Sequence, residues 1–190
     1  MLEFLNDIDT QIFIFLNGIH SPAWDQIMWW ISGKYEWLPL YAIIVAYIIY
    51  KFRWKALVSL VFIALVVTLA DQISVHGFKM VFERLRPCHN PELKDIVHIV
   101  NNKCGGQFGF VSSHAANTFA VAGFLSMLIK NKYFSIFIFV WATIVSYSRI
   151  YLGVHYPFDV LGGAVLGVVI GYVVFLLHQL FLRKTAKLFS

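Results

Sequence analysis

Residues 148–159 read Ser-Arg-Ile-Tyr-Leu-Gly-Val-His-Tyr-Pro-Phe-Asp and join two strongly apolar segments. They place an arginine, a histidine and a carboxylate where hydrocarbon should give way to headgroups and water. Ionisable groups near a bilayer are costly unless they are paired or used, so this cluster indicates a functional site. Pro157 suits the first position of a helix, and Asp159 then lies in the first turn. From there the Asp159 carboxylate could hold one ring nitrogen of His155 and leave the other free to attack or to accept a proton.

The composition predicts a membrane protein. Of the 190 residues, 59% are hydrophobic and 13% are charged, whereas soluble domains are about half apolar and about a quarter charged. Five strongly apolar segments contain no Asp, Glu, Lys or Arg: 37–50, 56–70, 115–129, 133–148 and 160–182. Several are shorter than the ~20 residues that span hydrocarbon, but interfacial Tyr, Trp, Lys and Arg side chains extend them. We therefore expect one integral-membrane domain over 1–190, an all-α transmembrane bundle with five spanning helices.

The N-terminal region, residues 1–35, gives no clean span because acidic residues interrupt its apolar pattern. We expect an interfacial amphipathic helix over 3–17, a turn over 18–22 and a second short helix to residue 31. A sixth span made from this region is the alternative.

The net charge of +5 does not predict nucleic-acid binding, because the basic residues form short clusters between the apolar spans. The clusters lie in alternate gaps and at the C-terminus: Lys51, Arg53 and Lys55; Lys130 and Lys132; Arg183, Lys184 and Lys187. The positive-inside rule makes those ends cytoplasmic. The long gap 76–113 and the turn 148–159 then face outward together, which predicts a site at the periplasmic face of a bacterial inner membrane.

The outer loop, residues 76–113, is too long for a simple connection, and its length therefore predicts a catalytic role. Lys79 and Arg86 are two helical turns apart, so we expect both on one face of a short helix that the following proline ends. Cys88 and Cys104 also lie in this loop. A periplasmic location favours a disulfide between them, with two free thiols as the alternative. A zinc site is disfavoured because no tight Cys/His pair spacing accompanies the two sulfurs.

The outer ends of the spans carry groups that suit phosphate. Ser112 or Ser113 is a good N-cap, so His114 stands at a helix N-terminus, where free backbone N–H groups form an anion site. Three cations, Lys79, Arg86 and Arg149, suit a multiply charged oxyanion.

Two histidines allow a division of labour at such a site. One can attack phosphorus while the other protonates the leaving group and later activates water. Because Asp159 can orient His155, we assign attack to His155 and acid–base catalysis to His114. The sequence holds no carboxylate cluster for two metals, so we expect no metal and no other cofactor.

With these residues the sequence resembles the phosphatidic acid phosphatase type 2 family, membrane lipid phosphatases that share an active-site plan with vanadium haloperoxidases. The family's first motif, a lysine, six residues and Arg-Pro, matches Lys79 and Arg86-Pro87. Its second, Pro-Ser-Gly-His, matches residues 111–114 in part, since Val111 and Ser113 replace the proline and the glycine. Its third, Ser-Arg, five residues, His, three residues and Asp, matches Ser148-Arg149, His155 and Asp159.

The resemblance implies a helical bundle in which His155 carries a phosphohistidine and His114 acts as acid and base. It implies that five residues hold phosphate: Lys79, Arg86, Ser112, the Ser113 backbone and Arg149.

The leading hypothesis is metal-independent hydrolysis of a membrane lipid mono- or diphosphate whose tail stays in the bilayer. The resemblance suggests undecaprenyl diphosphate, phosphatidylglycerol phosphate, phosphatidate and the 1-phosphate of lipid A, and the sequence does not choose among them. Two alternatives stay open: phosphoryl transfer to another lipid, and a non-enzymatic transporter or proton relay that uses the same His/Asp cluster. The sequence predicts no oligomeric state.

Overall fold

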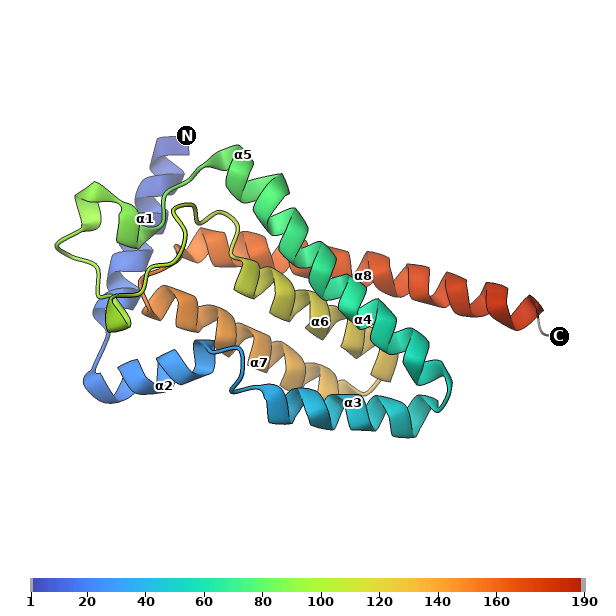
Figure 1. Cartoon of the computed structure of the whole chain (residues 1–190). Coiled ribbons are helices and arrows are strands. Elements are labelled where there is room, and N and C mark those ends of the chain that lie inside the picture. Colours follow the sequence, from blue (N-terminus) through green and yellow to red (C-terminus); the bar gives the residue numbers. More distant parts are fainter. Residues whose placement is uncertain (1, 189–190) are drawn as a thin grey trace.

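The computed structural model describes residues 2–188, and within them the chain is a helical bundle without β-strands (Figure 1). The long helices are α1 (Leu2–Gly18), α2 (Pro22–Ser32), α3 (Leu38–Phe52), α4 (Lys55–Gln72), α6 (Ser113–Ile129), α7 (Lys132–Tyr151) and α8 (Pro157–Leu188). Helix α4 continues into η1 (Ile73–Lys79) and α5 (Met80–Phe82), and three short 3₁₀ turns follow in the outer loop: η2 (Pro87–His89), η3 (Pro91–Leu93) and η4 (Val100–Asn102). The expected all-α architecture is confirmed.

Three continuous helical stretches are long and apolar enough to cross a membrane: Lys55–Phe82, Lys132–Tyr151 and Pro157–Thr185. The first of them joins α4 to α5 through the π-helical turn η1. Two further apolar helices, α3 and α6, are shorter. These five helices coincide with the five charge-free segments of the sequence, while the number of complete spans stays a prediction.

Glycines bring α6 and α8 into close contact. Gly163, Gly167 and Gly171 lie at four-residue spacing on α8, and a Cβ atom at any of them would overlap backbone atoms of α6. Small residues at this spacing let two helix backbones approach within a membrane. The contact sets the start of α6 beside the start of α8, where the Ser112 N–H donates to the Asp159 carbonyl at 2.9 Å.

The N-terminal helices follow the pattern expected from the sequence. In Figure 1, α1 lies across the end of the bundle, and α2 follows after a short turn. The Asn17 amide in α1 donates to the Tyr151 carbonyl at 2.8 Å and accepts from the His98 N–H at 2.8 Å. These bonds tie the outer loop to the end of α7. The interfacial position of α1 stays a prediction.

The expectation that Lys79 and Arg86 share one helix face is wrong. The helix that carries Lys79 ends at Phe82, and Glu83 adopts a left-handed conformation with φ 46°. The chain then becomes extended, because the Arg86 N–H donates to the Gln107 carbonyl at 3.1 Å instead of continuing a helical ladder. Arg86 is therefore positioned by the far side of the outer loop.

Candidate active site

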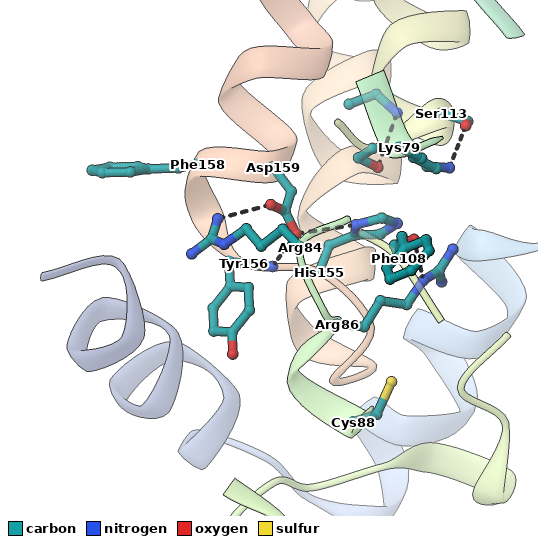
Figure 2. A network of polar contacts seen from close by, with 12 residues as sticks. Lys79, Arg84, Arg86, Cys88, Phe108, Ser113, His155, Tyr156, Phe158 and Asp159 are labelled. Carbon is teal, nitrogen blue, oxygen red and sulfur yellow. Dashed lines mark hydrogen bonds and ion pairs between the residues drawn. The ribbon is translucent and has the colours of Figure 1, made fainter. Parts of the chain in front are cut away.

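The turn between α7 and α8 holds the pair His155 and Asp159. Gly153 turns the chain at a φ of +76°, a conformation that side chains rarely adopt, and α8 begins at Pro157. The Asp159 carboxylate accepts from the Tyr156 N–H at 3.0 Å and lies 3.4 Å from Nδ1 of His155, as Figure 2 shows. This leaves Nε2 as the ring nitrogen turned away from the carboxylate, which is how an oriented imidazole nucleophile is held.

The surroundings of His155 keep its imidazole neutral. The side chain is 1% exposed, and burial lowers its pKa well below 6.5. The positive charges of Arg86, Arg149 and Lys79 lower the pKa further. A neutral imidazole has the lone pair that nucleophilic attack requires. The three cations expected from the sequence therefore surround the histidine that was assigned the attack.

Lys79 reaches this site from the end of η1. Its Nζ donates to the Ser113 hydroxyl at 2.6 Å (Figure 2). That hydroxyl also lies 2.7 Å from the Ser74 hydroxyl. Ser112 is the N-cap of α6, where its side chain accepts from the Ala115 N–H. The side chain at position 113, where the family has glycine, thus binds the lysine rather than leaving the position open.

The outer loop fixes Arg86 through backbone carbonyls. Its Nη1 donates to the Cys104 carbonyl at 3.0 Å, and its Nε donates to the Phe108 carbonyl at 3.2 Å. A disulfide joins Cys88 to Cys104, whose Cα atoms are 5.9 Å apart, and closes the segment that holds the guanidinium. His89 lies within 4.8 Å of both sulfurs. Sulfurs bonded to each other are not thiolate ligands, so this group does not form a zinc site.

Arg149 and His114 complete the cluster. Arg149 lies in the last turn of α7, and its Nη1 donates to the Ser32 hydroxyl. Its Nε is buried without a hydrogen-bond partner within residues 2–188, and a buried donor left unpaired is costly. His114, at the start of α6, is close enough to Arg149 and His155 for their charges to act on it. Both histidines and all three cations therefore meet at one end of the bundle.

Two residues that the sequence reasoning missed also belong to this cluster. Arg84 bridges two carboxylates, with Nη1 2.9 Å from Asp159 and Nη2 2.8 Å from Asp9 of α1. Its guanidinium also lies 4.2 Å above the Tyr156 ring. Asp9 accepts from the Phe158 N–H at 2.8 Å and so caps α8. Burial raises the pKa of Asp9, and the hydrogen bond and charge of Arg84 oppose that rise.

A sequence signal for these residues exists but is weak. Asp9 is an acidic residue within an apolar helical pattern, and Arg84 lies two positions before the motif arginine. Neither feature predicts the pairing, because 75 residues separate Arg84 from each of its partners.

A cavity of about 650 Å³, which we call the groove, opens beside His114. Helices α3, α4, α6 and α7 form its walls, and apolar side chains such as Ile44, Ile63, Val121 and Leu125 line it. A hydrocarbon chain could lie there while a headgroup occupies the cationic cluster.

The PAP2 superfamily model matches residues 56–183 of the chain. The lipid A 4'-phosphatase of Bacteroides thetaiotaomicron is 48% identical over 187 residues, which cover 96% of this chain and 83% of that protein. The lipid A 4'-phosphatase of Porphyromonas gingivalis is 33% identical and covers 92% and 74% respectively. The crystal structure of a transmembrane PAP2-type phosphatidylglycerolphosphate phosphatase from Bacillus subtilis superposes with a TM-score of 0.63 and 30% identity, over 95% of this chain and 87% of that one.

Proposed function

The chain belongs to the PAP2 superfamily of membrane lipid phosphatases, and from this premise we propose that it hydrolyses a lipid phosphomonoester through a phosphohistidine on His155. The observation that carries the proposal is the buried imidazole of His155, whose Nδ1 lies 3.4 Å from the Asp159 carboxylate and on which the charges of three cations act.

In the first step, Nε2 of His155 attacks phosphorus, and the bond from phosphorus to the lipid oxygen breaks. His114 gives its proton to the departing oxygen, so the lipid leaves as an alcohol. The imidazole of His155 becomes positively charged, and the Asp159 carboxylate beside its Nδ1–H stabilises that charge. In the second step, His114 removes a proton from water, the water oxygen bonds to phosphorus, and the bond to His155 breaks to release inorganic phosphate.

The phosphate oxygens are stabilised by fixed positive groups in this mechanism. Arg86 is held by the disulfide-closed loop, Lys79 by Ser113, and Arg149 offers its unpaired Nε. Donors that are already oriented before the reaction stabilise the charge that develops on phosphorus at little reorganisation cost. These residues supply that charge without a metal ion.

The names of two relatives support a choice of substrate class. We propose an acylated sugar phosphate of the lipid A class as the first substrate to test, because two relatives that the chain matches over most of their length are lipid A 4'-phosphatases. The membrane orientation is part of the proposal: the basic clusters lie at the opposite end of the bundle, where Lys51, Lys55 and Lys130 line one cavity. The positive-inside rule then puts His155 at the periplasmic face of the inner membrane.

The test is phosphate release by the detergent-purified chain from five lipids at equal mole fraction, with EDTA present. The panel holds lipid A with a 4'-phosphate, lipid A with a 1-phosphate, phosphatidate, phosphatidylglycerol phosphate and undecaprenyl diphosphate. We expect release that depends on His155 and survives EDTA, with lipid A turned over fastest. Absence of release from every lipid would overturn the proposal, and appearance of phosphate on a second lipid instead of in water would replace hydrolysis by phosphoryl transfer.

A further inference from the structure

Along the α6 wall of the groove, polarity falls with depth. His114, Asn117, Val121 and Leu125 all line the groove and follow one another at intervals of three or four residues. Because a helix rises about 1.5 Å per residue, Asn117 lies about 4.5 Å below His114 along the helix axis, and Val121 about 10 Å below it. Asn117 and Thr118 therefore separate the catalytic end of the groove from its hydrocarbon end, and the Thr118 hydroxyl already donates to the His114 carbonyl at 2.8 Å.

Two polar atoms in the groove lack a hydrogen-bond partner within the described part of the chain: Oδ1 of Asn117 and Nε1 of Trp141. Trp141 is 6% exposed, and the rings of Trp37 and Tyr41 pack edge-on against its indole at centroid distances of 5.6 and 6.1 Å. The indole N–H is therefore buried among other side chains. The Asn117 oxygen accepts a hydrogen bond, and the Trp141 N–H donates one. Leaving either of them unpaired in a nonpolar medium costs free energy, which an occupant of the groove that bonds to them would recover.

We propose that the groove binds an acyl chain of the lipid substrate and places its carbonyl linkage between Asn117 and Trp141, so that the enzyme selects acylated lipid phosphates over polyprenyl phosphates. The Trp141 N–H donates to the carbonyl oxygen, and the Asn117 amide pairs with an amide N–H or a hydroxyl of the same linkage. A polyprenyl chain offers only carbon and hydrogen at this depth and leaves both atoms unpaired. The inference rests on the proposed function, because the phosphate of the same lipid lies at His114 and His155.

The first test uses three substrates at equal mole fraction in detergent micelles: dihexadecanoyl phosphatidate, its dihexadecyl ether analogue, which lacks the carbonyls, and a polyprenyl phosphate. We expect kcat/KM for the ester to exceed both others about tenfold, because a site built for a polar group leaves its own groups unpaired when that group is missing. The difference should lie mainly in KM, since the tail contact is the same in the ground state and the transition state.

The second test repeats the ester-to-ether ratio in variants. Trp141→Phe keeps the aromatic packing but removes the N–H, so it should bring the ratio close to one. Asn117→Leu removes the amide at similar volume and should leave the ratio unchanged, because neither the ester nor the ether offers a donor to Oδ1 of Asn117. Ser146→Ala is the matched control, because Ser146 on α7 is also buried and unpaired but does not line the groove, and it should keep the wild-type ratio. A ratio within one variant does not depend on how much of that variant folds.

The outcomes separate this inference from the proposed function. Equal kcat/KM for the ester and the ether, a preference for the polyprenyl phosphate, or an ester-to-ether ratio that survives Trp141→Phe overturns the inference and leaves the phosphatase in place. No phosphate release from any lipid phosphate, including lipid A, overturns the proposed function instead.

Discussion

Replacing Arg84 by Met should lower both the free energy of unfolding and kcat, although Arg84 is not one of the residues assigned to bind the phosphate. The substitution keeps an apolar stem over Tyr156 and removes the positive charge that contacts both Asp9 and Asp159. Both carboxylates are 0% exposed. Breaking a buried ion pair by removing one partner costs about 3–5 kcal/mol, and we take the lower value, about 3 kcal/mol, because the Arg84 side chain is 21% exposed.

The rate should fall as well, because Asp159 loses one of the groups that hold it beside His155. Neutralising the equivalent aspartate of a serine-protease triad costs about 10⁴ in kcat. Arg84→Met leaves the Asp159 charge and its bond from the Tyr156 N–H in place, so we expect about 10²-fold in kcat and little change in KM. Phosphate release from lipid A at saturating substrate measures kcat, and the melting temperature in detergent reports stability.

Asp9→Asn in the Arg84→Met background separates the two effects. It removes one of the stranded carboxylates, so it should recover part of the lost stability without restoring kcat. Arg84→Lys, which retains the charge but not the two-pronged geometry, should fall between wild type and Arg84→Met. The reasoning is refuted if Arg84→Met melts several degrees lower yet turns over at the wild-type kcat, since Arg84 would then be structural only.

Three further predictions concern other parts of the site. Asp159→Asn should leave the helical fold intact, as measured by circular dichroism, and lower kcat by up to about 10⁴ because the His155 tautomer is no longer fixed; an unimpaired rate would remove Asp159 from the mechanism. The double variant Cys88→Ser/Cys104→Ser removes a disulfide that joins residues 16 apart in sequence, so it should lose about 3 kcal/mol of stability. It should also raise KM, because the Cys104 carbonyl positions Arg86. An unchanged KM would contradict that role. The pKa of His155 is lower in the folded state than the 6.5 of the unfolded chain. Below about pH 6.5 the unfolded chain therefore binds more protons, so the free energy of unfolding should fall as pH decreases from there. His155→Gln should remove this part of the pH dependence in denaturant titrations, and an identical pH profile would show that His155 is not buried in the neutral form.

The fold was largely predictable because membrane helices leave a strong local signal. Uninterrupted apolar segments marked the five bundle helices. Pro157 and Ser112 marked helix starts through their own conformational preferences. The pairing of His155 with Asp159 was also local, since one helical turn separates them.

The features that the sequence did not predict depend on contacts between residues far apart in the chain. The expected helix over Lys79 and Arg86 assumed that the helical period continues, but the left-handed Glu83 ends it and pairing with residues 107–109 extends the chain. The salt bridges of Arg84 join three distant segments, so periodicity could not find them. Asn117 lies on α6 and Trp141 on α7, and their unpaired atoms can be recognised only from the side chains packed around them.

The most direct test of the account is the covalent state of His155 during turnover. His114→Ala, incubated with a phosphomonoester of an acidic phenol, should still undergo attack, because that leaving group needs no proton from His114, but it should hydrolyse the intermediate slowly. We predict an acid-labile, base-stable phosphate that accumulates on His155 in this variant, turns over rapidly in the wild type, and is absent from His155→Ala. A phosphate trapped on any other residue, or one that persists in His155→Ala, would contradict the assignment of the nucleophile.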